Sequence, residues 1–504
     1  GTKNMGASFG FDQAVILPVP FEYETDEFGL SLEYVGQKLQ SQFSYMGSLF
    51  NNDADAIQWS NPYENAASDT ARGQMAEYPD NQFHQFSALF GYQLRDDTRL
   101  GLRLSRGRMT QDENYLPYTV NPGLPQTELP ASSLDATVDT TLAAFDVNSR
   151  PTRNLSLDGS YTYSDRDNKT DSRVYDYVVA DSGPGGMRRN APYSYKQRLL
   201  RLKAAYRFPK DVNFSVGYDD DQRTRSYVQI EDTHDKTGWA KLRLRPLDSL
   251  EATLKYAYAD RDGSDYVPLQ DIDPLLENPN PNIYENPLMR VVQLADRKRN
   301  TTGLLLTYTP VSRLSLGFDI DYSKDDYDSD YLGLQEASNT TYTASGSYLF
   351  SEDLSTTLYY THEELKSDQK GSEKQFYDDP EHFWVMSDEY KTDTVGLGVN
   401  WQGMDDKLRV GADLTYAEYS GDIEFSSGQA LPDTGSKLTA LDMHATYRLS
   451  DQLSLGARLR YEDYEEDDWT KDGYVDTLPN LLSLGTAPQD QSTLLGYVSV
   501  RYQF

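Results

Sequence analysis

Residues 450–462 of this chain read SDQLSLGARLRYE. After a polar turn at 450–452, apolar side chains occupy every second position and end in tyrosine: Leu453, Leu455, Ala457, Leu459 and Tyr461. A period of two residues is that of a β-strand, and small or charged residues fill the alternate positions. A strand of about nine to eleven residues with one apolar and one polar face suits a transmembrane β-barrel, which meets lipid outside and water inside.

The same unit recurs along the chain. It follows Pro310 as Leu314, Leu316, Phe318, Ile320 and Tyr322, and it follows Leu247 as Leu250, Ala252, Leu254, Tyr256 and Tyr258. The last strand alternates in the same way and ends on Tyr502 and Phe504, which resembles the C-terminal assembly signal of bacterial outer-membrane barrels. An edge strand of a soluble β-sandwich could end similarly, so the repeat and the C-terminus together carry the prediction.

Composition agrees with a barrel in the bacterial outer membrane. Hydrophobic residues make up 38% of the chain, and no stretch approaches the roughly twenty apolar residues of a membrane helix. A barrel tolerates this because only alternate strand residues meet lipid. The 39 tyrosines suit the aromatic belts at the two membrane surfaces, whereas a large soluble β-protein is the competing interpretation.

Turn signals predict an antiparallel all-β barrel with short periplasmic turns and long extracellular loops. Long polar connections are expected near residues 50–81, 111–132, 164–193, 261–288 and 421–436. Two strands per short turn, the final strand and a fragment before Pro18 give about twenty strands, and we expect residues 1–504 to form one barrel domain. The short turns are predicted near residues 36–38, 95–97, 150–153, 209–211, 246–248, 310–313, 351–353, 403–406 and 450–452.

Charge is distributed unevenly. The net charge is −33, and acidic runs follow two predicted strands, at 325–330 and 462–468. We interpret them as solvated loop surface, with Ca²⁺ binding as the alternative, although the ligand spacing of an EF-hand is missing. Basic residues alternate on faces that we expect to point inward, and with His444 they are candidates for contact with a partner in the lumen: Arg201, Lys203, Arg207, Lys241 and Arg243.

Catalytic and cofactor-binding motifs are missing from the sequence. There is no cysteine, so this chain has no thiolate metal site and no attachment point for haem c. The five histidines are scattered and accompany neither a nucleophile elbow nor a zinc motif. We expect no enzymatic activity and no nucleic-acid partner, with outer-membrane lipid as the surroundings.

Several segments together resemble the MtrB/PioB family of decahaem-associated outer-membrane barrels. The most specific is YPDNQFHQ at 78–85, which contains Pro79, Asp80, Asn81, Gln82 and His84. The others are NPY at 61–63, YSDRDN at 163–168, RDGSDY at 261–266 and ADR at 295–297.

The resemblance implies a barrel that surrounds a periplasmic decahaem cytochrome and presents it to an extracellular decahaem cytochrome, with haem c carried by those partners. Family members usually begin with a Cys-X-X-Cys segment and further strands that are absent here. The chain therefore resembles the C-terminal three-quarters of a barrel of about 26 strands. A general diffusion porin or a substrate-specific channel is the alternative, whereas a plugged transporter would need a globular domain before the barrel.

Overall fold

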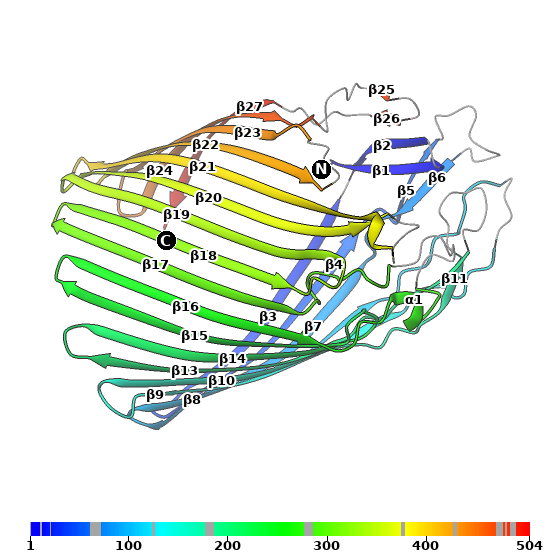
Figure 1. Ribbon diagram of the computed structural model, residues 1–504, viewed down its shortest axis with the longest axis horizontal. Coiled ribbons are helices and arrows are strands. Elements are labelled where there is room, and N and C mark those ends of the chain that lie inside the picture. Colours follow the sequence, from blue (N-terminus) through cyan, green and yellow to red (C-terminus); the bar gives the residue numbers. More distant parts are fainter. Residues whose placement is uncertain are drawn as a thin grey trace.

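The computed structural model describes residues 2–10, 13–20, 22–60, 72–122, 127–176, 186–276, 286–373, 379–426, 431–469, 477–478, 481–483 and 490–503. Nineteen strands form one barrel-shaped sheet, and the eighteen strand pairs that follow one another from β3 to β27 are all antiparallel (Figure 1). Long connections gather at one end of the ring and short turns at the other (Figure 1). No helix within the described ranges is both long enough and apolar enough to cross a membrane.

The ring follows chain order, apart from short strands that lie in its loops. Its members are β3 (Tyr23–Val35), β4 (Leu39–Asn52), β7 (Asn81–Arg95), β8 (Thr98–Gln111), β9 (Ala136–Ser149), β10 (Leu155–Asn168), β13 (Tyr195–Phe208), β14 (Val212–Arg225), β15 (Asp232–Leu247), β16 (Leu250–Gly263), β17 (Arg297–Val311), β18 (Leu314–Tyr327), β19 (Gly333–Ser351), β20 (Leu354–Ser372), β21 (Phe383–Gly403), β22 (Leu408–Phe425), β23 (Thr434–Arg448), β24 (Leu453–Asp467) and β27 (Gln491–Tyr502).

Smaller elements lie outside the ring. One four-stranded sheet has the order β1-β2-β26-β25, and two hairpins pair β5 with β6 and β11 with β12. Their bounds, with those of the helices, are β1 (Thr2–Gly10), β2 (Gln13–Pro20), β5 (Ala56–Ser60), β6 (Arg72–Ala76), β11 (Val174–Asp176), β12 (Met187–Arg189), α1 (Leu269–Ile272), the 3₁₀ helix η3 (Pro380–His382), β25 (Thr477–Leu478) and β26 (Leu481–Ser483).

Every short turn predicted from sequence joins two neighbouring ring strands. One of them connects β13 to β14 through Lys210 and Asp211, whose φ angles of 65° and 54° are both left-handed. Two left-handed residues in succession give a hairpin whose twist matches that of its strands. The fragment before Pro18 was wrongly counted as a barrel strand, because β1 and β2 belong to the separate four-stranded sheet.

The strands are longer than the predicted nine to eleven residues, reaching 21 in β21. Two acidic runs that we expected in loops therefore lie partly in strands. Asp325 and Asp326 belong to β18, and β24 continues to Asp467. The alternation of apolar and polar residues stops before the strand itself ends. Beyond the hydrocarbon layer both faces of a strand can be polar, while the hydrogen-bonded ladder continues.

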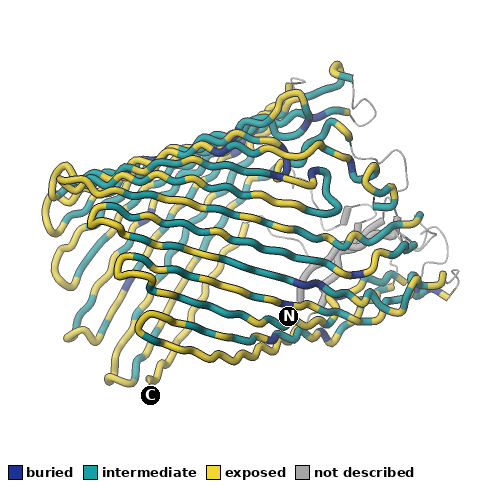
Figure 2. Tube along the Cα trace, turned by 90° about the horizontal axis from the view of Figure 1, so that it is seen from below, coloured by how far each residue is buried: buried dark blue, intermediate teal, exposed yellow. Residues whose placement is uncertain are grey.

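One seam of the ring is packed less than the rest. Strands β27 and β3 are adjacent there in the strand order, and because the number of strands is odd they run in the same direction, unlike the antiparallel pairs elsewhere. Every described residue of both strands is exposed. Figure 2 shows the exposed stretch that ends at the C-terminus. The other ring strands mix exposed with half-buried residues, so the seam is the part of the wall with the least lateral packing.

Candidate lumen interface

Alternation along each strand separates a lipid face from a lumen face. Leu304, Leu306 and Tyr308 of β17 lie opposite Ile320, Phe318 and Leu316 of β18, which forms an apolar outer surface. Across the same two strands, Gly303 lies opposite Asp321 and Thr301 opposite Ser323 on the inner surface. Following this register around the ring assigns each strand residue to one face.

The register places the predicted basic residues on the lumen face of neighbouring strands. Arg201 lies opposite Asp219 of β14, and the Lys203 ammonium is 3.2 Å from a carboxylate oxygen of Asp158 on β10. Arg207 donates to Asn213 at 3.4 Å. Asp158 therefore neutralises one of these cations from within the barrel wall itself.

Strands β15 and β16 carry a second group of cations. Arg243 donates through Nε and Nη2 to the two oxygens of Glu251, both at 2.7 Å, and Arg245 lies 3.7 Å from the same carboxylate. Lys241 lies directly opposite Lys255, so two like charges face each other across the strand pair. One carboxylate thus serves two guanidinium groups beside two further ammonium groups.

We call the lumen-facing residues of β13 to β17 the basic arc. Its carboxylates are Asp219, Asp221, Asp235 and Glu251, and its cations outnumber them: Arg201, Lys203, Arg207, Arg223, Arg225, Lys241, Arg243, Arg245, Lys255, Arg261, Arg297 and Arg299.

A buried ion-pair network that the sequence did not reveal lies on the lumen face, at the long-loop end of the basic arc. Asp325 of β18 is 8% exposed and accepts from Arg299 on β17. Arg297 lies 3.2 Å from Asp235 on β15 and 3.9 Å from Asp325. Buried charges are stable only when paired, so this network ties three strands together.

The lumen face of β19, β20 and β21 has different chemistry, and we call it the hydroxyl arc. Thr343 and Thr361 are joined by a hydrogen bond of 3.1 Å, and Ser347 and Thr357 by one of 3.0 Å. The Tyr359 ring lies over Gly396, where a Cβ atom would come within 2.2 Å of it. No lysine or arginine occupies a lumen position of these three strands.

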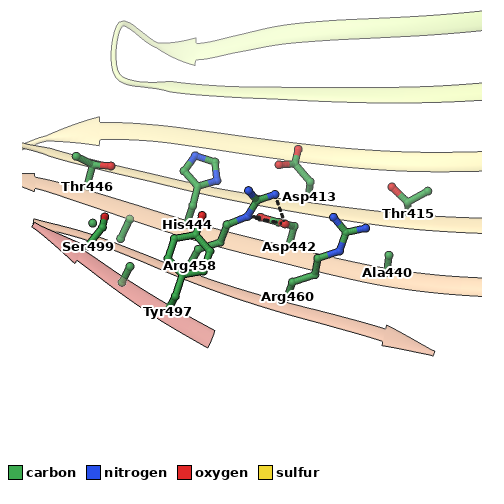
Figure 3. A pocket seen from close by; sticks show the side chains of 13 residues that line it. Asp413, Thr415, Ala440, Asp442, His444, Thr446, Arg458, Arg460, Tyr497 and Ser499 are labelled. Atoms are coloured by element: carbon green, nitrogen blue, oxygen red, sulfur yellow. Dashed lines mark hydrogen bonds and ion pairs between the residues drawn. The ribbon is translucent and has the colours of Figure 1, made fainter. Parts of the chain in front are cut away.

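His444 lines a hollow of about 620 Å³ in the lumen wall of β22, β23, β24 and β27 (Figure 3). Asp442 and Arg458 form a two-pronged ion pair beside it, with Nε to oxygen distances of 2.9 and 2.8 Å. The imidazole lies over Gly411, where a Cβ would be 2.3 Å from it. On this register His444 lies on the lumen face, next to a charged pair.

The whole sequence, residues 1–504, matches the family described as outer membrane beta-barrel porin, MtrB/PioB. This chain belongs to the MtrB/PioB family. It is 28% identical to the outer membrane protein MtrB of Shewanella baltica (strain OS185), over all of this chain and 70% of that protein.

Solved outer-membrane receptors show a weaker likeness. A mutant of the ferric enterobactin receptor PfeA from Pseudomonas aeruginosa matches with a TM-score of 0.46 and 11% identity, over 87% of this chain and 72% of the receptor. The siderophore receptor PirA from Acinetobacter baumannii matches with a TM-score of 0.44 and 10% identity, over 96% of this chain and 78% of the receptor.

The segment at 78–85, on which the resemblance to the family chiefly rested, shapes the long-loop end of the β4–β7 pair. The Asp80 carboxylate accepts from the backbone N–H of Asn52 at 2.7 Å, and the Asn81 side chain donates to the Pro79 carbonyl at 3.2 Å. Gln82 follows in β7 opposite Leu49. This part of the segment therefore holds the end of β4 against the start of β7.

His84, from the same segment, lies on the outer face of β7. Its Nδ1 is 2.9 Å from the hydroxyl oxygen of Tyr45 on β4. Across the β7–β8 pair it lies opposite Arg108. The histidine therefore contributes to the rim of the barrel wall and not to the lumen.

Two further family-like segments, 261–266 and 295–297, meet at the long-loop end of the basic arc. Arg261 donates to the backbone carbonyls of Ala295, Gln293 and Val292, and Gly263 donates its N–H to Asp296 at 2.8 Å. Burial raises the pKa of the Asp296 carboxyl. These contacts hold the connection between β16 and β17 against the barrel wall.

The remaining predictions concern the C-terminus, metal ions and one loop segment. Tyr502 lies opposite Leu453 in the β24–β27 pair, whereas Phe504 and the 61–63 segment lie outside the described residues. Among the residues that the structure describes, no group of three or more His, Asp or Glu side chains is arranged to hold a metal ion. Calcium binding by the acidic runs stays a prediction.

Proposed function

We propose that this barrel surrounds a periplasmic multihaem c-type cytochrome and holds it against an extracellular multihaem cytochrome, so that electrons cross the outer membrane. A guest of the decahaem class fits the proposal, because it supplies a continuous chain of haems. The redox chemistry belongs to the haems of the partners, and the barrel supplies position, insulation and sealing.

The basic arc is the observation that carries this proposal. Haem propionates and acidic protein surfaces are anionic, and cations in a confined lumen attract such groups more strongly than they would in bulk water. Glu251 and Asp158 neutralise only some of the positive charges of the arc. Lys241 and Lys255 lie opposite each other, so their ammonium groups repel. An anionic guest would relieve that repulsion.

The dimensions of the ring and of the membrane support the same conclusion. Barrels of sixteen to eighteen strands already enclose an aqueous channel, and this ring has nineteen strands. A hydrocarbon layer of roughly 30 Å is too thick for one electron-tunnelling step, so cofactors must be threaded through it and kept from lipid. The described elements outside the ring are short and gather at its long-loop end (Figure 1).

Co-expression with a candidate multihaem cytochrome tests the proposal. The purified barrel should retain haem in a fixed ratio and, in liposomes, should reduce a dye sealed inside when reductant is added outside. The control is the barrel expressed without the cytochrome, which should contain no haem and should leave the dye oxidised. A barrel that retains no haem, reduces no dye and passes small solutes freely would instead be a diffusion porin.

A further inference from the structure

A group of cations on the lipid side of the wall is unrelated to the lumen. The Asp139 carboxylate of β9 is 1% exposed and receives three cations from the outer face. Arg108 Nε lies 2.7 Å from Oδ1, while Arg106 Nη2 and Lys169 Nζ lie 2.8 and 2.7 Å from Oδ2. Arg106 also donates to Thr141. We call Arg106, Arg108 and Lys169 the outer cluster.

Register places the outer cluster outside the barrel. On β8 the same face carries Leu100, Leu102 and Leu104 before it reaches Arg106. Phe86, which is 65% exposed, lies directly opposite Arg106 on β7. The change from leucine to arginine beside an exposed aromatic ring marks the border between acyl chains and headgroups.

The outer cluster lies at the long-loop end of β8, and therefore in the outer leaflet. The short turn at 96–97 precedes the leucines, and the long connection that begins at 112 follows Arg108. Phosphorylated glycolipid is the characteristic anionic lipid of that leaflet in Gram-negative bacteria.

Charge in the outer cluster is unbalanced. Asp139 is shared by all three cations, and the other carboxylate in ion-pair range among the described residues is Asp167, 3.8 Å from Lys169. The side chains of Arg106 and Arg108 are 56% and 59% exposed. Asp139 thus fixes their positions while much of each guanidinium faces outward.

We propose that the outer cluster binds a phosphate group on a glycolipid of the outer leaflet. Two guanidinium groups held side by side suit the tetrahedral oxygens of a phosphate, which accepts paired charge-assisted hydrogen bonds. Lys169 supplies a third charge from just beyond the end of β10, and Phe86 lies at the level of the upper acyl chains. The wall is thereby anchored to the headgroup layer independently of any guest in the lumen.

Binding of fluorescent lipid A to the detergent-solubilised barrel tests this site. Lipid A should bind at least about tenfold more tightly than its dephosphorylated form, because removing the phosphate removes charge-assisted hydrogen bonds. Arg106→Gln with Arg108→Gln should abolish that preference. Folding of each variant is checked by heat-modifiable mobility in gels, and Lys169→Gln, which lies outside the strands, provides a milder variant that should reduce the preference.

The matched control is Lys366→Gln with Lys391→Gln on the outer face of β20 and β21. Those lysines contact Glu364 and Glu389 at 2.8 to 3.1 Å, so their charges are balanced. Their removal should leave the preference for lipid A unchanged. Equal binding of the two lipids, a preference that survives the arginine changes, or displacement by inorganic phosphate at the same concentration as lipid A would each overturn the proposal.

Discussion

The basic arc and the hydroxyl arc are parts of one continuous wall, yet they offer a guest different surfaces. The first presents guanidinium and ammonium groups such as Arg243 and Lys241, and the second presents hydroxyl groups such as those of Thr343 and Thr361. Their outer faces are alike, since both present leucine and tyrosine to lipid. Lipid therefore imposes the same requirement all around the ring, whereas the lumen face is free to vary with its contents.

The largest expected effect should be the same in the two arcs. Leu254 is on the lipid-facing side of a basic-arc strand, and Leu397 is on the lipid-facing side of a hydroxyl-arc strand. Each lies opposite another leucine in the apolar band, and we consider the changes Leu254→Arg and Leu397→Arg. Each change should destabilise the inserted barrel by about 2 to 4 kcal/mol, because it places a charge in hydrocarbon. The measurement is the folding equilibrium in liposomes under urea.

The register itself is tested by pairs of neighbouring residues. Leu316→Arg and Leu455→Arg should impair insertion, whereas Ser315→Arg and Ser454→Arg, which face the lumen, should insert normally. Equal folding yields for the leucine and serine variants would show that the assignment of faces is wrong.

An intermediate effect should separate the two arcs. Neutralising Arg201, Lys203, Lys241 and Arg243 to glutamine should lower retention of a multihaem guest by about tenfold, through loss of several charge-assisted contacts. The matched variant introduces glutamate at Thr341, Thr343, Thr357 and Thr361 of the hydroxyl arc, which changes the lumen charge by the same amount. Haem content after purification is the measurement. A similar loss in both variants would mean that overall lumen charge, and not the position of the arc, holds the guest.

The smallest effect should come from single carboxylates. Glu251→Gln removes the partner of Arg243 and Arg245 and should lower the free energy of unfolding by less than about 1 kcal/mol, because the pairs are partly exposed. Glu363→Gln, in the hydroxyl arc, should be neutral because its contact is a 3.5 Å hydrogen bond from Asn339. High salt should erase the difference between them, and a difference that persists in salt would contradict the electrostatic explanation.

The sequence predicted those features that lipid or turn geometry imposes. Leu316 and Leu455 identified the outer face because hydrocarbon excludes polar side chains from alternate positions, and the turn at Lys210 and Asp211 was recognisable from the polar residues after Pro209. The positions of Lys203 and Arg243 on the inner face followed from the same alternation. No comparable constraint marks strand ends in water, so the continuation of β18 through Asp325 was missed.

Contacts between distant residues were also beyond sequence reasoning. Arg297 on β17 meets Asp235 on β15 across 62 positions, and Arg106 on β8 meets Asp139 on β9 across 33, because the registers of consecutive strands bring them together. A single sequence contains each charge but not the register. The fragment before Pro18 was assigned to the barrel for a related reason. Its alternation predicts a strand, but it does not indicate which sheet that strand joins.

The length of the longest strands has a consequence for what happens above the membrane. At 3.3 Å per residue and a tilt near 40°, the 21 residues of β21 rise roughly 50 Å along the barrel axis, against a hydrocarbon layer of roughly 30 Å. The wall therefore continues as a rigid collar beyond the lipid. A surface-bound protein that docks on this collar would be held at a fixed height above the lipid by hydrogen-bonded strands instead of by loops.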